Sequence, residues 1–209
     1  MSNGGESLVE RILASAEWRR GSPWRSMRQG LAHRSLHVHV EKQVIPFIDH
    51  WYRPLADYWN LVALAYLHDI GQPLVRSPEG RRQGDLHSLV SARVAVSLGA
   101  PSRLVSVILR HNRCFAYWRR LFAGDGQWHG DRWSSALQAR FLRHFGFGAV
   151  DLTLLVLFQR ATNAYSRPPV SRESTDAVYW FERRLLVEGL LSELPVAAQD
   201  ARSPWSNNA

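Results

Sequence analysis

Residues 61–73 read LVALAYLHDIGQP, an apolar run that leads into a His-Asp pair and then into a glycine and a proline. Glycine and proline both end helices, so the segment predicts a helix over about residues 54–69 with a stop directly after it. Side chains three or four positions apart share one face of a helix. One such face collects Leu61, Leu64, Ala65 and His68.

The same spacing recurs along the chain, and the alternating runs typical of strands are almost absent. Segments rich in glycine, proline and arginine, such as residues 74–84, separate the helical patterns and predict loops. We therefore predict an all-α bundle. Its helices are expected near residues 8–21, 35–48, 54–69, 85–98, 101–111, 133–145, 149–165 and 174–194.

Composition excludes several classes of protein. The chain has 209 residues, 45% of them apolar, and a single cysteine, so it is neither disordered, collagen-like nor a disulfide scaffold. No apolar run approaches the ~20 residues of a membrane span, and the first ten residues do not resemble a secretory signal. We expect a cytoplasmic protein with no membrane partner.

The net charge of +8 is the difference between 26 basic and 18 acidic residues, and Lys42 is the only lysine among the basic ones. Arginine grips phosphate with two parallel hydrogen bonds, so an anionic partner such as a phosphorylated small molecule, a nucleotide or a nucleic acid is expected. A bias of genomic base composition would also favour arginine over lysine, and the ratio alone does not decide between the two explanations. The oligomeric state is left open.

Four of the predicted apolar faces include or end on a histidine. A single histidine on such a face is more often a satisfied core residue. Four of them on helices that surround one core can instead converge, with Asp69 adding a carboxylate, and metal sites in helical bundles are built from such inward side chains. The sequence therefore predicts a metal site formed by His37, His68, Asp69, His87 and His111.

With these residues in place, the chain resembles the HD-domain metal-dependent phosphohydrolases. The resemblance rests on the apolar run and HDIGQP at residues 64–73, on His37 standing 31 positions before His68, and on the ordered His87 and His111. From His68 to about Tyr165 it is most similar to the HD domain of bacterial tRNA nucleotidyltransferases. The nucleotide-transferring head domain of those enzymes has no room in this chain.

The resemblance implies a domain organisation and a chemistry. It implies an HD domain over residues 30–168, an N-terminal helical extension over 1–29, and a C-terminal helix with a frayed tail over 169–209. It also implies a divalent metal, one or two ions of Mn, Fe, Ni, Co, Zn or Mg, that activates water and neutralises charge on phosphoryl oxygens. His68 and Asp69 would then be catalytic, and the arginines expected to hold substrate phosphate are Arg76, Arg81, Arg82 and Arg110.

One position departs from the family pattern. The family closes its site with an aspartate on the last helix, and this chain has Thr162 and Asn163 there. Asp151 lies about three turns earlier, roughly 16 Å along the axis, which is too far for a direct replacement. Thr162 and Asn163 are therefore the candidates for the closing ligand position.

Three functions remain open from the sequence. The first is a phosphomonoesterase or phosphodiesterase acting on a nucleotide or related phosphate ester. The second is a non-catalytic HD module that binds RNA, nucleotide or protein through its basic surface. The third is a di-iron oxygenase, because some HD-fold proteins with extra histidines have that activity. Bound metal separates the first and third from the second, and dioxygen consumption separates the third from the first.

Overall fold

The computed structural model describes residues 4–23, 35–75, 86–111 and 151–163. These segments are helical almost throughout, and none of them contains a strand, which confirms the all-α prediction. The predicted helices at residues 133–145 and 174–194, and the whole predicted C-terminal extension, lie outside the described residues. None of the described helices is long and apolar enough to cross a membrane.

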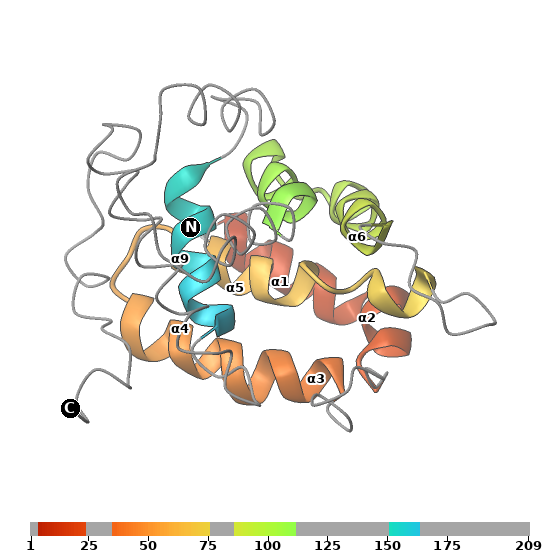
Figure 1. Cartoon of the computed structure of the whole chain (residues 1–209), viewed down its shortest axis with the longest axis horizontal. Helices are drawn as coiled ribbons and strands as arrows, with labels where there is room; N and C mark the ends of the chain where they lie inside the picture. Colours follow the sequence, from red (N-terminus) through yellow and green to blue (C-terminus); the bar gives the residue numbers. More distant parts are fainter. Residues whose placement is uncertain (1–3, 24–34, 76–85, 112–150, 164–209) are drawn as a thin grey trace, which may run out of the picture.

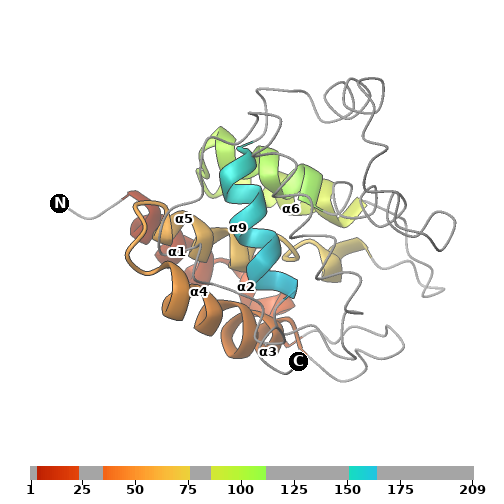
Figure 2. The same ribbon diagram turned by 60° about the vertical axis from the view of Figure 1, so that its left-hand side comes forward.

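Helix α5 (Tyr58–Leu67) forms the centre of the described structure. Every side chain from Leu61 to Leu67 is buried, so the helix is apolar on all sides. Helices α1 (Gly4–Ala14), α4 (Ile45–Tyr52), α6 (Leu86–Ser97) and α9 (Leu152–Asn163) pack around it (Figures 1 and 2). The resulting single apolar core fixes the end of α5, where the His-Asp pair lies.

The N-terminal segment belongs to this core. Leu8 and Ile12 of α1 are buried against α5, and a Cβ atom at Gly5 would lie only 2.7 Å from Cβ of Trp59. The single helix predicted over residues 8–21 is in fact two, because the chain breaks at Ser15 and continues as α2 (Ala16–Gly21). The Ser15 hydroxyl caps α2 by accepting a hydrogen bond from the backbone N–H of Trp18.

The segment from residue 35 to 52 is continuous but irregular. It consists of α3 (Leu36–His39), a π-helical turn η1 (Val40–Val44) and α4. An α-helix has 3.6 residues per turn, so a face repeated every four residues drifts by roughly 40° per turn. The wider π turn absorbs this drift, so that one buried face collects Leu36, Val40, Val44 and Ile48.

Polar contacts hold the far ends of three helices together. Arg103 donates to both Asp57, just before α5, and Asp151, at the start of α9, over 3.0 and 2.7 Å. Asp151 also caps α9 by accepting from the N–H of Leu154. Gly99 ends α6 with a φ of 76°, a conformation that favours glycine, as its position in the sequence predicts.

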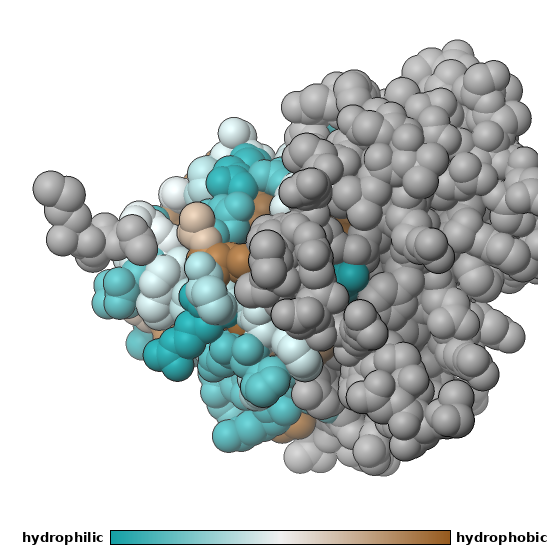
Figure 3. Space-filling model, turned by 90° about the vertical axis from the view of Figure 1, so that its left-hand side faces the viewer, coloured by the Kyte–Doolittle hydropathy of each residue, from teal (hydrophilic) through white to brown (hydrophobic). Residues whose placement is uncertain are grey.

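The described surface seen in Figure 3 is mostly hydrophilic, with small separate apolar areas. Large apolar side chains with more than a third of their area exposed are few among the described residues: Leu13, Leu74, Leu86, Leu89 and Val96. Three of these flank the gap between residues 75 and 86.

Candidate metal centre

The C-terminal end of α5 positions the first two groups of the site. The backbone N–H of His68 bonds to Leu64 O and closes the last turn, and the ring Nδ1 of His68 lies 2.9 Å from the Ala65 carbonyl. The chain turns immediately afterwards, which brings Oδ2 of Asp69 to 3.3 Å from Nε2 of His68. His68 is buried, whereas the Asp69 side chain is 17% exposed.

Two further histidines approach the other side of Asp69. His87, in the first turn of α6, has Nε2 at 3.6 Å from Oδ1 of Asp69. His111, on the helix over residues 102–111, is buried, and its ring centroid lies 5.6 Å from that of His68 and 5.9 Å from that of His87. The structure thus places His68, Asp69, His87 and His111 close together.

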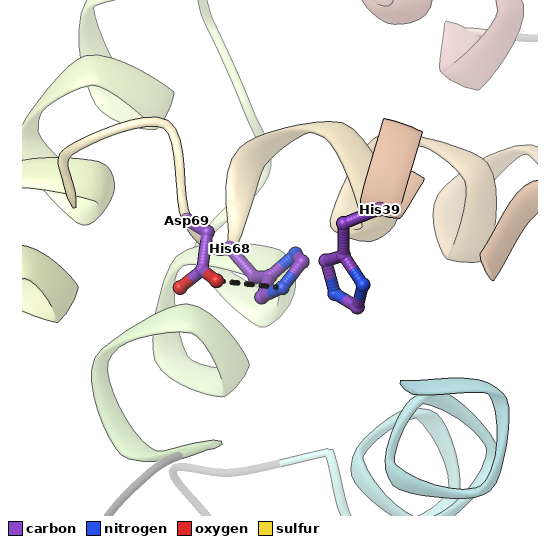
Figure 4. A group of neighbouring side chains, drawn as sticks. All are labelled: His39, His68 and Asp69. Carbon is purple, nitrogen blue, oxygen red and sulfur yellow. Dashed lines mark ion pairs between the residues drawn. The ribbon is translucent and has the colours of Figure 1, made fainter. Parts of the chain in front are cut away.

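The fourth imidazole is that of His39, not that of His37. The His39 ring lies 5.6 Å from the His68 ring, and Figure 4 shows the His68 ring between Asp69 and His39. His37, predicted as a ligand, instead directs Nδ1 to Glu41 at 3.2 Å and is 45% exposed. His37 and His39 flank the buried stripe of Leu36 and Val40 on opposite sides, and the packing of α3 selects His39.

The ligand atoms form two groups that share Asp69. One consists of His39, His68 and Asp69, the other of Asp69, His87 and His111, and within each group one ligand atom per residue lies within 4.8 Å of the others. Two ligands about 2.1 Å from a metal and 90–110° apart are roughly 3.0–3.4 Å from each other. The contacts of 3.3 and 3.6 Å are close to that spacing.

Three of the rings are held in the orientation that metal ligands need. The Nδ1 atoms of His68 and His111 lie 2.9 and 2.7 Å from the carbonyl oxygens of Ala65 and Ile108, and Nδ1 of His39 lies 3.2 Å from Oε1 of Gln43. Oxygens of this kind only accept, so Nδ1 carries the proton and the neutral ring has its lone pair on Nε2. Histidine ligands of metals are commonly oriented in this way.

The turn after Asp69 is fastened to α6. The backbone N–H of Gly71 donates to Oγ of the buried Ser91 over 2.9 Å. A Cβ atom at position 71 would lie 2.6 Å from the Ser91 nitrogen and 2.7 Å from the His87 carbonyl, so only glycine allows this approach. The glycine of the HDIGQP motif therefore sets the distance between Asp69 and His87.

Helix α9 covers the cluster with an aromatic ring. Phe158 packs edge-on against His68 and His111, with centroids 5.0 and 6.1 Å apart, and Gln159 donates to the His111 carbonyl. Thr162 lies one turn beyond Phe158, and its hydroxyl donates to the Gln159 carbonyl. The side chain of Asn163, the other candidate closing ligand, lies outside the described part of the chain.

Burial and the single carboxylate set the charges of the cluster without metal. Burial lowers the pKa of His68, but the Asp69 carboxylate outweighs it, so the pKa is raised. Burial opposes ionisation of Asp69, but His68 beside it holds the pKa of that carboxyl well below its usual range. Burial, together with the charge on His68, lowers the pKa of His111 to about 4. The Asp69 carboxylate thus favours the protonated form of His68, and a metal ion bound there would compete with that proton.

Of the predicted phosphate-binding arginines, only Arg110 falls in the described part of the chain. It is half-buried and precedes His111 on the same helix. Arg76, Arg81 and Arg82 lie outside the described residues. In the sequence they fall between η2 (Gln72–Val75), which follows the HDIGQP turn, and the start of α6.

His39 is the site residue that the sequence prediction missed. A signal for it exists: His37 has a glutamate four positions later, the pattern of an exposed ion pair, whereas His39 has the neutral Gln43 there.

Searches of family models, curated proteins and solved structures found no match to this chain. The described residues define an all-α protein with a cluster of histidines and one aspartate that could hold a metal ion.

Proposed function

We propose that this protein is a metal-dependent phosphohydrolase that cleaves a phosphate ester at the cluster around Asp69. The observation that supports this proposal most directly is the convergence of four imidazoles on one carboxylate, three of them with Nδ1 fixed to an oxygen. A core histidine that only needs its polar atoms satisfied does not require three neighbours of the same kind. The resemblance to HD-domain phosphohydrolases favours the same chemistry.

The ligand set favours a transition metal. Four imidazole nitrogens and one carboxylate suit Zn²⁺, Fe²⁺, Co²⁺ or Ni²⁺ and also accept Mn²⁺, whereas Mg²⁺ prefers oxygen ligands and keeps several waters. We therefore place Mg²⁺ last among the candidates. His39, His68 and Asp69 would hold one ion, and Asp69, His87 and His111 a second.

When bound, the cation lowers the pKa of a water molecule and neutralises charge that develops on phosphoryl oxygens. The residues contribute position and proton control. Asp69 would orient the attacking water, since its carboxylate is ionised and partly exposed. Phe158 excludes solvent from the His68 and His111 side, so that the open approach to the cluster is past Asp69 and His87, whose side chains are 17% and 16% exposed.

The substrate class follows from charge rather than from shape. A phosphorylated small molecule or a nucleotide fits an arginine-rich chain, and Arg110 is the described arginine nearest the cluster in sequence. A nucleic acid is a further candidate of the same chemistry. We expect the reaction to take place in the cytoplasm, because the one cysteine gives no sign of an oxidising compartment.

The test starts from the protein purified without chelator and analysed for bound elements. Hydrolysis of p-nitrophenyl phosphate and bis(p-nitrophenyl) phosphate is then measured with each candidate metal. Asp69→Asn and His68→Gln are expected to lose metal and at least about 100-fold in rate, since removing one group that stabilises a transition-state charge commonly costs that much. His37→Gln serves as the matched control and should retain both metal and activity.

Hydrolysis that survives in both cluster variants would contradict the proposal. Bound metal without hydrolysis of any phosphate ester would favour a different enzyme, a di-iron oxygenase. The specific observation in its favour is that Asp69 alone joins two groups of histidines, an arrangement suited to two neighbouring ions. Substrate-dependent consumption of dioxygen by the iron-loaded protein would identify it. Absence of metal in every preparation would leave a non-catalytic binding module.

A further inference from the structure

The two ligand groups are poor in negative charge. Among the described residues, Asp69 supplies the only carboxylate of either group, and its two oxygens are divided, Oδ2 toward His68 and Oδ1 toward His87. The other ligands are histidines, which are neutral when they bind a metal. Glu41, on the π-helical turn that continues α3, is paired with His37, and neither residue belongs to a ligand group.

With so few carboxylates, a second ion is bound less favourably than the first. Counting the described residues alone, one divalent ion with Asp69 gives the cluster a formal charge of about +1, whereas two ions with the same carboxylate give about +3. Repulsion between two divalent ions is about four times that between unit charges at the same distance, and paired catalytic ions lie only about 3.5–4 Å apart. His68 and His111 are buried, so water screens this repulsion poorly.

We propose that the cluster binds one divalent cation by itself and takes up the second only together with an anion such as phosphate. This inference rests on the proposed function, because it concerns the same metal site. A phosphate dianion placed between the ions supplies the negative charge that a second carboxylate would otherwise bring. The position where that carboxylate is expected holds Thr162, whose hydroxyl is bonded to its own helix.

The consequence is a reciprocal coupling of the metal and the anion. If phosphate raises the affinity for the second ion, the second ion raises the affinity for phosphate by the same factor. Couplings between linked sites are commonly about 5–150-fold. A phosphorylated substrate would thus assemble its own two-ion site, and the site would return to one ion when the product phosphate leaves.

The experiment measures stoichiometry rather than turnover. Wild-type protein is dialysed to equilibrium against Co²⁺ in chloride or in inorganic phosphate at equal ionic strength, and bound cobalt is counted by elemental analysis and by its visible absorption. We expect one ion per chain in chloride and two in phosphate, with at least about a tenfold rise in affinity for the second ion. His37→Gln should behave as wild type.

Single-group variants locate the ions. His39→Gln and His87→Gln each spoil one group and should bind one ion in both buffers, with circular dichroism confirming that they are folded. Two ions in chloride, or one ion in phosphate, would overturn the inference while leaving the metal site intact. No bound cobalt in either buffer would instead overturn the metal site, and with it the proposed function.

Discussion

At the scale of single residues, the buried imidazole of His111 makes the stability of the metal-free protein depend on pH. Its pKa of about 4 lies below that of a histidine in the unfolded chain, about 6.5. Between these values the unfolded state binds the extra proton, so stability decreases as the pH falls. We expect a loss of about 2 kcal/mol between pH 6.5 and 4.5, measured by urea denaturation in chelator.

The other two titrating groups act in different windows. The raised pKa of His68 adds stability below pH 6.5 that is lost as the pH rises through the raised value, and the lowered pKa of Asp69 adds stability that is lost below its ordinary value of 3.8. His111→Asn, whose amide can still donate to Ile108, should flatten the slope between pH 6.5 and 4.5. An unchanged slope would assign it to other groups.

A substitution at Thr162 is expected to raise the affinity for metal rather than lower it. It lies four positions after Phe158, and residues at this spacing share a helix face, here the face that covers His68 and His111. We expect Thr162→Asp to raise the affinity for a divalent ion by about tenfold or more, because one added favourable charge contact of about 1.4 kcal/mol has that effect. Calorimetric titration with Zn²⁺ checks this, with Thr162→Asn as the uncharged control.

At the scale of elements, the contact between the turn after Asp69 and α6 sets the geometry of the cluster. A methyl group at position 71 would overlap the backbone of His87 and Ser91, so Gly71→Ala must push α6 away. We expect a loss of about 1–3 kcal/mol in the free energy of unfolding and weaker metal binding. Gly4→Ala is the matched control, because a Cβ atom there meets nothing within 4 Å. Equal effects of the two changes would refute this role for Gly71.

Helical periodicity predicts some of these elements and misses others. The helices around residues 61–67, 86–97 and 152–163 were predictable because their apolar content and their glycine and proline breaks agree. The break at Ser15 and the π turn after His39 were not, since each depends on local hydrogen bonds that a 3.6-residue repeat does not encode. The choice of His39 over His37 depends on which side of α3 faces α5, and that is a property of the packing.

At the scale of the whole molecule, a metal ion would tie together elements that are far apart in sequence. The cluster draws on α3, the end of α5, α6 and the helix over residues 102–111, so an ion bound there is held only by the folded chain. At a metal concentration about 100 times Kd, the folded state should gain about 2.7 kcal/mol. Thermal unfolding with Zn²⁺ and with chelator measures this gain.

The variant His68→Gln should lose this stabilisation by Zn²⁺, and His37→Gln should keep it. A gain of equal size in His68→Gln would place the stabilising ion elsewhere.

Most of the candidate cluster was predictable at this scale, since four of its five residues lie at the ends or on the inner faces of predicted helices. The fifth residue, His39, depends on how the helices pack around α5, and that packing emerges only from the assembled core.

The unequal exposure of the cluster also determines how fast its contents exchange. His68 is enclosed by α5 and Phe158, whereas Asp69 and His87 form the accessible edge, next to the first turn of α6. An ion bound there would therefore leave past that turn, and its departure would require a local opening rather than unfolding of the core. Removal by a chelator should accordingly be far faster than global unfolding, and a weakened hydrogen bond between Gly71 and Ser91 should accelerate it further.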